Sequence, residues 1–341
     1  MLIAPATKYC DLAAKNAKIT KMKKPLCPLR PMRSLRLNKN CPKSLYFIAA
    51  SIGDKSSIAS MKITLITACY NSAATIRTAM DSVLTQRGVD LEYIVVDGGS
   101  KDGTVDIIKE YSAKPSDQRL KTNDFTFRWL SERDRGMYDA INKGIKMATG
   151  DIVGILNADD VLASDDTLAH IASAFEQNGS SVLRSQFPIP QRIDALYADI
   201  RFVRAGDSLA ALRSAKTVRY CSARRWRPWM FRFAAMVPHP SFYVRRECFE
   251  RLGTYSLDYR ICADFELELR YLYLAKLKAA YLPECVVVMR MGGASTCGWR
   301  ANMEINRQDL QALRAHGIWS CLPLIYLKYL FKIWGFVFKS R

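Results

Sequence analysis

The sequence predicts an α/β fold in which helices cover both faces of a central sheet that is mixed but mainly parallel. Two observations point to this fold class. From residue 61 onward, short β-rich runs alternate four times with segments of helical periodicity, and the connections between them are short. In addition, Asp97 follows the second run and Asp159 follows the fourth, at the strand ends beyond which such sheets bind their ligands.

The first half of the pattern consists of four pairs of a strand and a helix. Each strand is a short apolar, β-rich run, and each helix repeats its apolar residues at helical spacing. Gly150 is expected to end the third helix. The strands are expected over residues 62–68, 91–96, 125–130 and 152–156, and the helices over 71–86, 104–111, 137–148 and 167–177.

After about residue 190 the order of elements changes, and we interpret the remaining elements as the second half of the same domain. A hairpin strand and a basic aromatic loop come first, and a strand, a helix and a last strand come after them. These elements are expected over residues 195–203, 219–233, 241–244, 265–276 and 281–289.

The formal net charge is +19, and its distribution separates residues 1–60 from the rest. This leader holds twelve Lys or Arg against two acidic residues, a net +10. Because Pro25, Pro28, Pro31 and Pro42 would interrupt any helix and no sustained periodicity is present, we expect it to be disordered. A mitochondrial-type presequence is an alternative, and Met61 is a possible biological start. The main domain is then expected over residues 61–300, and a C-terminal helical segment over 301–341.

The cysteine pattern and the absent glycine motifs narrow the classes of protein. The ten cysteines form no C-x-x-C pair and no metal-ligand rhythm, which indicates a reducing, cytosolic compartment. Neither the G-x-G-x-x-G of nicotinamide enzymes nor the P-loop signature occurs. A bound nucleotide would therefore be held through a carboxylate and a metal ion instead of a glycine cradle.

Two adjacent carboxylates end the fourth expected strand, in the sequence "ILNADDVL". Asp159 is suited to hold a divalent ion that bridges the phosphate oxygens of a nucleotide. The alternative is that Asp159 or Asp160 caps the following helix, and both readings hold together if Asp160 is the cap and Asp159 the ligand.

Four further residues have a functional and a structural interpretation. Asp97 in "DGGS" is placed to accept from a nucleotide base or ribose, or to form an ordinary turn. Asp264 is a candidate general base, or a residue favoured at a helix start by the helix dipole. Arg135 would reach a phosphate or belong to a solvated loop. His239 would contact donor or acceptor, or make a structural hydrogen bond.

Taken in order, several motifs resemble the family 2 glycosyltransferases, nucleotide-sugar enzymes of the GT-A fold, and are most similar to the bacterial branch that builds surface polysaccharides. The resemblance covers residues 62–295. Its motifs are "TACYNSAATIRTAMDSVLTQ", "IVVDGGSKDGT", "SERDRGMYDAINKGIKMATGDIVGILNADD", "HPSFYVRRECFERLGTYS", "ADFELELR" and "MGGAS".

The resemblance implies a role for each candidate. Asp159 would bind Mg²⁺ or Mn²⁺ within a D-x-D-type motif whose first position is Asn157 here. Asp264 would be the catalytic base of an inverting transfer, and Asp97 would bind the base of the donor. The residues expected to contact the nucleotide-sugar donor are Thr67, Tyr70, Asn71, Asp97, Arg135, Asp139, Asn157, Asp160 and His239. The acceptor is expected to be a saccharide or a lipid-linked saccharide.

The C-terminal tail, residues 317–341, is strongly apolar and interrupted by lysines. On a helix, Lys328, Lys332 and Lys339 would form one cationic edge, which suits an anionic membrane interface. The alternative is a terminal helix packed on the domain. We expect a cytoplasmic protein bound peripherally to the inner face of the cytoplasmic membrane.

Two other functions compete with sugar transfer. The pI of about 9.6 and the loop with Arg224, Arg225, Trp226, Arg227 and Trp229 are compatible with binding of single-stranded nucleic acid. Much of the positive charge lies in the leader, so nucleic acid is not the expected partner. A sugar nucleotidyltransferase would usually carry a Gly-rich first loop, which is absent here.

Overall fold

The computed structural model describes residues 61–113, 124–176, 192–204, 206–292 and 298–329. The expected leader over residues 1–60 and the tail residues Lys332 and Lys339 lie outside the described residues. Gln177, the expected last residue of the fourth helix, also lies outside them.

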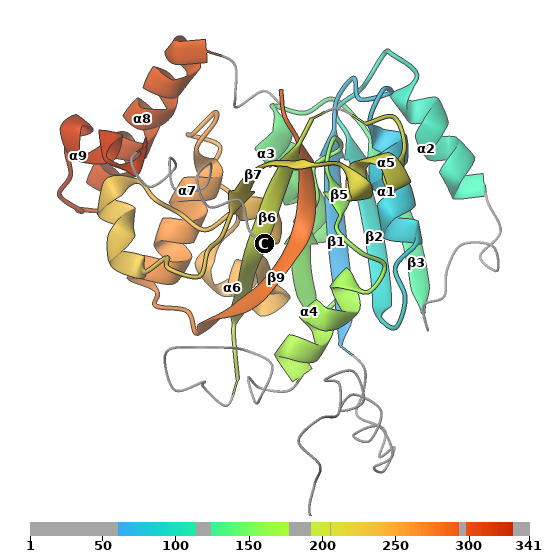
Figure 1. Cartoon of the computed structure of the whole chain (residues 1–341), viewed down its shortest axis with the longest axis horizontal. Coiled ribbons are helices and arrows are strands. Elements are labelled where there is room, and N and C mark those ends of the chain that lie inside the picture. The colour runs from blue at the N-terminus through green and yellow to red at the C-terminus, as the bar shows by residue number, and fades with distance from the viewer. Residues whose placement is uncertain (1–60, 114–123, 177–191, 205, 293–297, 330–341) are drawn as a thin grey trace, which may run out of the picture. The chain divides into compact units, whose positions relative to one another are not determined.

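Within the described residues, a nine-stranded sheet has the order β3-β2-β1-β4-β8-β6-β9-β5, with β7 paired to β6 (Figure 1). Its first half is parallel: β1 pairs with β2 and β4, and β2 pairs with β3. These strands are short β-branched runs, as the pattern predicts. Their bounds are β1 Lys62–Cys69, β2 Asp90–Asp97, β3 Phe125–Ser131 and β4 Ile152–Ile155.

The second half of the sheet is mixed. β8 is antiparallel to β4 and β6, β9 is parallel to β6, and β7 forms the hairpin partner of β6. Since β6 and β9 thereby run in the direction of β4, their carboxyl ends lie at the same edge of the sheet. The bounds are β5 Val161–Leu162, β6 Ala195–Val203, β7 Thr217–Cys221, β8 Tyr243–Arg245 and β9 Ala279–Arg290.

Helices cover both faces of the sheet, which confirms the expected fold class. On β1, Ile63 and Leu65 belong to one apolar cluster and Ile66 to another, because successive side chains of a strand point to opposite faces. Helices α1, α2 and α4 pack in the first cluster, and α3, α6, α7 and α8 in the second. The helices are α1 Ile76–Leu84, α2 Thr104–Ala113, α3 Met137–Met147, α4 Thr167–Glu176, α5 Leu209–Ser214, α6 Arg246–Leu252, α7 Ala263–Glu268, α8 Gly298–Ala315 and α9 Leu322–Tyr326.

Gly150 does not end α3 as expected. The helix already ends at Met147, and its C-cap residue Ala148 has extended backbone angles. A Cβ atom at Gly150 would lie 2.7 Å from Thr64 Oγ1 and 2.8 Å from the carbonyl oxygen of Lys62. Gly150 is therefore needed for the close approach of the chain to β1, just before β4 begins.

Two expected elements consist of shorter segments in the structure. They are the helix over residues 265–276 and the basic loop over residues 219–233. After α7 the chain continues as the π-helical segment η5 (Leu269–Leu274). The loop contains the end of β7 and the 3₁₀ segment η3 (Pro228–Phe233). Trp226 is buried, and its indole N–H donates to the carbonyl oxygen of Ala235 at 3.0 Å, so this ring packs in the core and not on the surface.

The start of the apolar tail packs on the domain. Lys328 is buried, and its ammonium donates to Asp309 Oδ2 of α8 at 2.7 Å, so it does not belong to the cationic edge expected at the membrane interface. Ile325 of α9 is fully buried in the same apolar cluster as Leu310 and Leu313 of α8. No helix of the described residues has both the length and the apolar character needed to cross a bilayer.

Lys328→Met should destabilise the protein by about 3–5 kcal/mol, because it leaves the buried Asp309 carboxylate without its cation. Urea unfolding followed by circular dichroism measures this change in the free energy of unfolding. Lys109→Met on exposed α2 is the matched control, with an expected effect within about 0.5 kcal/mol. The double variant Lys328→Met/Asp309→Leu should recover much of the loss, and a destabilisation equal to the single variant would contradict a cost that arises from the unpaired charge.

Candidate active site

The carboxyl edge of the sheet carries most of the candidate residues. Asp97 ends β2 directly opposite Cys69, the last residue of β1, and the turn after β4 carries Asp159. Helix α3 starts at this edge because it follows the carboxyl end of β3. The hydroxyl of Tyr138, in its first turn, donates to Asp264 Oδ1 of α7 at 3.1 Å. The fold thus brings Asp97, Asp159 and Asp264, which are distant in the chain, to one edge of the sheet.

Hydrogen bonds between the β1–α1 and β2–α2 turns order this edge. Asn71, which has a positive φ of 49°, accepts from the backbone N–H of Lys101 at 3.0 Å. Its own N–H donates to Ser100 Oγ at 2.7 Å. The N–H groups of Ser72 and Ala73 donate to side chains of the second turn. Asn71 therefore joins the two turns. If its side chain also contacts the nucleotide-sugar donor, the same side-chain amide must serve both contacts.

Asp97 is fully buried and acts as the hydrogen-bond acceptor of its own turn. Oδ2 accepts from the N–H groups of Gly99 and Ser100, each at 3.0 Å, and from Ser131 Oγ at 2.7 Å, while Ser100 Oγ donates to Oδ1. Burial alone would raise the pKa of Asp97, but these hydrogen bonds outweigh it and lower the pKa below its usual value. The turn interpretation of "DGGS" is therefore observed directly, and the contact with a base stays a prediction.

Thr67 and Tyr70 differ in their access to a ligand. Thr67 is fully buried in β1, and its Oγ1 accepts from the hydroxyl of Tyr93 at 3.1 Å. Tyr70 lies just after the strand and is exposed. Of these two residues predicted to contact the nucleotide-sugar donor, only Tyr70 has a side chain that is exposed to solvent.

Arg135 and Asp139 form one charged cluster at the start of α3. Asp139 Oδ2 accepts from the backbone N–H of Arg135 at 3.1 Å, and the guanidinium of Arg135 lies 3.6 Å from Oδ1. Lys143 on the next turn lies 3.9 Å from Asp139 and 2.8 Å from Glu132. Asp139 is thus engaged in local pairing, whereas the Arg135 side chain is largely exposed beside the edge.

The turn from Asn157 to Asp160 folds back on itself. Asp160 is fully buried, and its Oδ2 accepts from the side-chain amide of Asn157 at 2.8 Å. The alternative that Asp159 or Asp160 caps the following helix is wrong, because β5 follows Asp160 directly and α4 begins only at Thr167. Burial and the neighbouring Asp159 raise the pKa of Asp160 well above its usual value.

Arg290, at the end of β9, holds the backbone of this turn. Its guanidinium donates to the carbonyl oxygen of Asp159 at 2.7 Å and to Thr78 Oγ1 at 2.8 Å. Arg290 is half-buried, and this burial lowers its pKa although Asp159 and Asp160 oppose the shift. An anchor on three separate elements, α1, the turn and β9, fixes where Asp159 lies.

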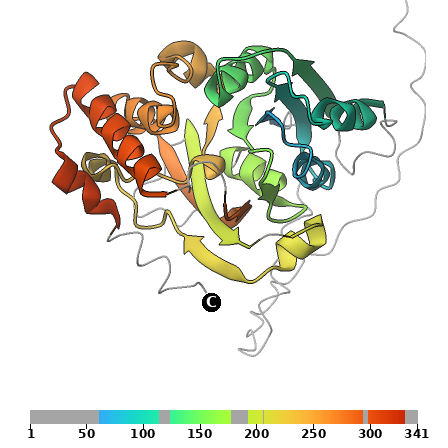
Figure 2. The same ribbon diagram turned by 90° about the horizontal axis from the view of Figure 1, so that it is seen from above.

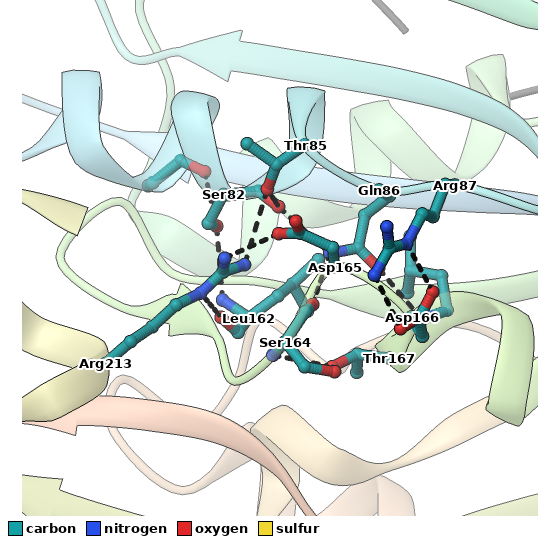
Figure 3. A network of polar contacts seen from close by, with 12 residues as sticks. Ser82, Thr85, Gln86, Arg87, Leu162, Ser164, Asp165, Asp166, Thr167 and Arg213 are labelled. Carbon is teal, nitrogen blue, oxygen red and sulfur yellow. Dashed lines mark hydrogen bonds and ion pairs between the residues drawn. The ribbon is translucent and has the colours of Figure 1, made fainter. Parts of the chain in front are cut away.

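The segment after the turn is fixed by a second polar network (Figure 3). Gln86 Nε2, at the end of α1, donates to the carbonyl oxygens of Ser82 at 3.1 Å and Ser164 at 2.7 Å. Arg213 of α5 donates to the carbonyl oxygen of Leu162 at 3.0 Å and pairs with Asp165 at 2.6 Å. The turn with Asp159 is therefore held on both of its sides.

The donor set at this turn fits a divalent cation. Asp160 Oδ1 is buried and has no hydrogen-bond partner among the described residues, and the half-exposed Asp159 stands beside it. Carboxylate and amide oxygens suit Mg²⁺ or Mn²⁺. The described residues contain no cluster of three or more His, Cys, Asp or Glu side chains that could hold a metal ion. The residues at this turn therefore fit an ion that is held by one or two carboxylates and has phosphate oxygens as its other ligands.

Asp264 lies in the first turn of α7, as the sequence predicts, and its carboxylate is only partly buried. Oδ1 accepts from Tyr138 at 3.1 Å and from the N–H of Phe265 at 2.8 Å. The hydroxyl of Tyr138 also lies within hydrogen-bond distance of the carbonyl oxygen of Ile261. No contact occupies Oδ2 in the described residues, so this oxygen is free to accept a proton.

His239 lies in a buried layer behind Asp264. Its Nε2 lies 2.7 Å from the hydroxyl of Tyr255, and the two rings make an edge contact. Tyr255 stacks on Tyr138, and Asn142 of α3 fixes the Tyr255 backbone through two hydrogen bonds at 2.8 and 3.0 Å. His239 is buried and makes the structural hydrogen bond that was foreseen as an alternative. Burial lowers the pKa of its imidazole, although Asp264 opposes the shift.

Three residues of the site were not predicted in these roles. Arg290 ends β9 directly after the apolar run 286–289, and that position was the available signal. Tyr138 was assigned only to a helix face. Glu268 is fully buried and accepts from the N–H of Val237 at 3.1 Å, and burial followed by Asp264 raises its pKa well above the usual value. Its helical spacing from Asp264 was the only signal in the sequence.

The low pKa of His239 predicts a loss of stability in mild acid. A buried neutral imidazole disfavours protonation, so stability is retained above the ordinary value of 6.5 and falls as the pH drops below it. The contribution is at most about 1.4 kcal/mol per pH unit. Urea titrations between pH 7.5 and 5.5 should show this slope in the wild type and not in His239→Gln. The exposed His170→Gln is the control, and an unchanged slope in His239→Gln would contradict the assignment.

Two proteins with similar sequences are named as a glycosyltransferase and as a polysaccharide synthase. A PGL/p-HBAD biosynthesis glycosyltransferase of Mycobacterium bovis is 28% identical over 213 residues, which are 62% of this chain and 70% of that protein. The poly-beta-1,6-N-acetyl-D-glucosamine synthase of Staphylococcus epidermidis is 33% identical over 146 residues, which are 40% of this chain and 33% of that protein.

Solved structures share the fold at low sequence identity. TarS of S. aureus, residues 1–349 in complex with UDP-GlcNAc, has a TM-score of 0.51 and 16% identity, and the match covers 74% of this chain. The chain spans 66% of that TarS chain, just under two thirds. The mannosyltransferase PcManGT of Pyrobaculum calidifontis, in complex with GDP-Man and Mn²⁺, has a TM-score of 0.51 and 21% identity, with 82% of this chain and 73% of that one covered.

The family itself is established by a match over much of the catalytic domain. The model of glycosyl transferase family 2 matches residues 64–249, more than half of the chain, and this range includes Asp97 and the turn with Asp159. The chain is therefore a glycosyltransferase and belongs to glycosyl transferase family 2.

Proposed function

We propose that the protein transfers a sugar from a nucleoside-diphosphate donor to a hydroxyl group of a saccharide or lipid-linked acceptor, with inversion at the anomeric carbon. The observation that carries this proposal is the placement of Asp264 at the sheet edge that also carries Asp159. Relatives named for poly-beta-1,6-N-acetyl-D-glucosamine synthesis and for PGL/p-HBAD biosynthesis support a role in cell-surface polysaccharide or glycolipid synthesis. We place the reaction at the inner, cytoplasmic face of the cytoplasmic membrane.

Asp264 acts as the general base in this proposal. Its partly exposed carboxylate takes the proton of the acceptor hydroxyl as the oxygen forms its bond to the anomeric carbon. The bond from that carbon to the diphosphate oxygen breaks, and its electron pair leaves with the nucleoside diphosphate. Tyr138 and the N–H of Phe265 hold Oδ1, so Oδ2 faces the acceptor with little rotational freedom.

The residues on the donor side bind and neutralise the nucleotide. Asp159 would hold Mg²⁺ or Mn²⁺, with Asp160 and Asn157 beside it, and such an ion supplies charge stabilisation to the departing diphosphate. The complex of PcManGT with GDP-Man and Mn²⁺ supports a divalent ion in a fold of this kind. The exposed Arg135, which pairs with Asp139, would meet a phosphate. Tyr70 would stack on the base, and the turn around Asp97 would present the base-binding edge. The remaining predicted donor contacts, Thr67, Asn71, Asp139 and His239, would act through the shape of the pocket.

Asp264→Asn should lower the rate of transfer by about 10²–10⁴-fold, because the amide cannot accept the acceptor proton. Donor binding should stay within about twofold of the wild type, as measured by isothermal titration with the donor and Mn²⁺. Asp258→Asn, an exposed carboxylate in the preceding loop, is the matched control and should keep full activity. Transfer by Asp264→Asn at the wild-type rate would rule out this base.

Asp159→Ala should remove the dependence of donor binding on the metal ion. A screen of UDP-, GDP- and dTDP-sugars with Mn²⁺ first identifies the donor. Removal of the ion with EDTA should then weaken donor binding by the wild type at least tenfold and leave the already weak binding by Asp159→Ala unchanged. An equal response of both proteins to EDTA would exclude Asp159 as a ligand.

Proton NMR of the first product formed tests whether the configuration at the anomeric carbon is inverted.

A further inference from the structure

A groove of about 480 Å³ lies between η3, η5 and the chain around α9. Trp229 packs edge-on against Phe233 at one side of it, with ring centroids 5.7 Å apart. Ser320 Oγ donates to the carbonyl oxygen of Arg232 at 2.7 Å, which holds the neighbouring Trp319 beside η3. We call this surface the Trp229–Trp319 groove, and its lining residues are Trp229, Arg232, Phe233, Tyr273, Trp319 and Leu324.

The two tryptophans of the groove are unusually exposed. Trp319 is 73% exposed and Trp229 is 55% exposed, although such large apolar side chains are mostly buried in soluble domains. Leu322, Tyr326 and Leu327, which come after Trp319 in the chain, are also exposed. A cluster of exposed aromatic and aliphatic side chains marks an interaction surface.

Two of the three segments that line the groove carry no acidic residue. Residues 208–246 contain nine Lys or Arg, and residues 310–329 contain Arg314 and the internally paired Lys328, with no Asp or Glu in either. The exposed guanidinium groups of Arg224, Arg225 and Arg232 have no carboxylate partner among the described residues. Tryptophan beside unpaired arginine is the composition found where proteins meet the headgroups of a bilayer. The chain beyond Tyr329, "LFKIWGFVFKSR", continues this composition without an acidic residue.

The groove is connected to the proposed base by one aromatic layer. Phe231 is fully buried and contacts Tyr273 of the groove, with ring centroids 6.3 Å apart. On its other side Phe231 contacts Phe265, the residue after Asp264, at 5.7 Å. The groove and the helix that carries Asp264 therefore pack against the same buried ring, Phe231.

We propose that the Trp229–Trp319 groove and its arginines bind the surface of an anionic lipid bilayer. This inference rests on the proposed function in one respect, the delivery of a lipid-linked acceptor to Asp264. Binding is peripheral: the indole rings enter the headgroup region, and the arginines pair with lipid phosphates.

Flotation of the full chain with vesicles tests the proposal. Wild type should float with vesicles of phosphatidylglycerol and phosphatidylcholine, and much less with phosphatidylcholine alone. Trp229→Ala/Trp319→Ala should need at least tenfold more lipid for half-binding, and Arg232→Ala about fivefold more. Lys109→Ala, the loss of one exposed charge on α2, is the control and should bind like wild type. Figures 1 and 2 place α2 on the opposite side of the sheet from α9.

Brominated lipids separate this surface from the basic leader. Bromine should quench part of the tryptophan fluorescence, and Trp229→Phe/Trp319→Phe should lose that part while still floating. Equal flotation of wild type and the double alanine variant, or unchanged quenching in the phenylalanine variant, would overturn the proposal. A concentration-dependent dimer that the alanine variant abolishes, without any lipid binding, would also overturn it. Asp264→Asn should float like wild type, so a failure of the proposed base would leave this test unaffected.

Discussion

The parallel pairing of β1 with its two neighbours is the constraint on which the rest of the site depends. β1 pairs in register with β2 so that Cys69 lies opposite Asp97, and β4 pairs along its other side. Because all three strands end at one edge, the turns after them lie at that edge, and hydrogen bonds through Asn71 and Ser100 join the turns after β1 and β2. Any change of register would separate the turn that carries Asp97 from the turn that carries Asp159.

The close contacts of two glycines make this pairing possible. Gly150 passes against β1 just before β4, and a Cβ atom at Gly154 within β4 would lie 2.2 Å from the ring of Tyr243. Tyr243 belongs to β8, the strand that turns the sheet from its parallel half to its mixed half. The junction between the halves therefore tolerates only a residue without a side chain at this point. In the chain after this junction, Asp264 of α7 accepts a hydrogen bond of 3.1 Å from Tyr138 of α3.

The elements with strong local patterns could be predicted from the sequence. The strand that begins at Lys62 and the helix that begins at Met137 have the expected bounds within a residue or two, because their apolar spacing reflects burial on one face. The start of α7 at Ala263 was also close to the expected position of Asp264. The three acidic residues were singled out by their positions at element ends, which local sequence specifies.

Features that depend on distant contacts could not be predicted. Lys328 was expected on a cationic edge at a membrane interface, because its helix spacing says nothing of Asp309, nineteen positions earlier, which pairs with it in the core. Asp160 was expected as a possible cap because the two-residue strand β5 has no detectable pattern. The contact of Arg290 with Asp159 spans 131 positions, and Trp226 gave no sign that Ala235 would accept its N–H. In each case a tertiary partner, absent from the local sequence, decided the outcome.

The central claim is that Asp159 and Asp264 act on opposite sides of the transferred sugar. Asp159 holds the metal ion at the diphosphate, and Asp264 takes the proton of the acceptor hydroxyl. The most direct measurement is a crystal structure with Mn²⁺ and the unreactive form of the identified donor, with the manganese located by anomalous scattering. The account predicts manganese on the carboxylate of Asp159 and an anomeric carbon whose open face is directed at Asp264 Oδ2. Manganese bound elsewhere, or an anomeric carbon turned away from Asp264, would contradict it.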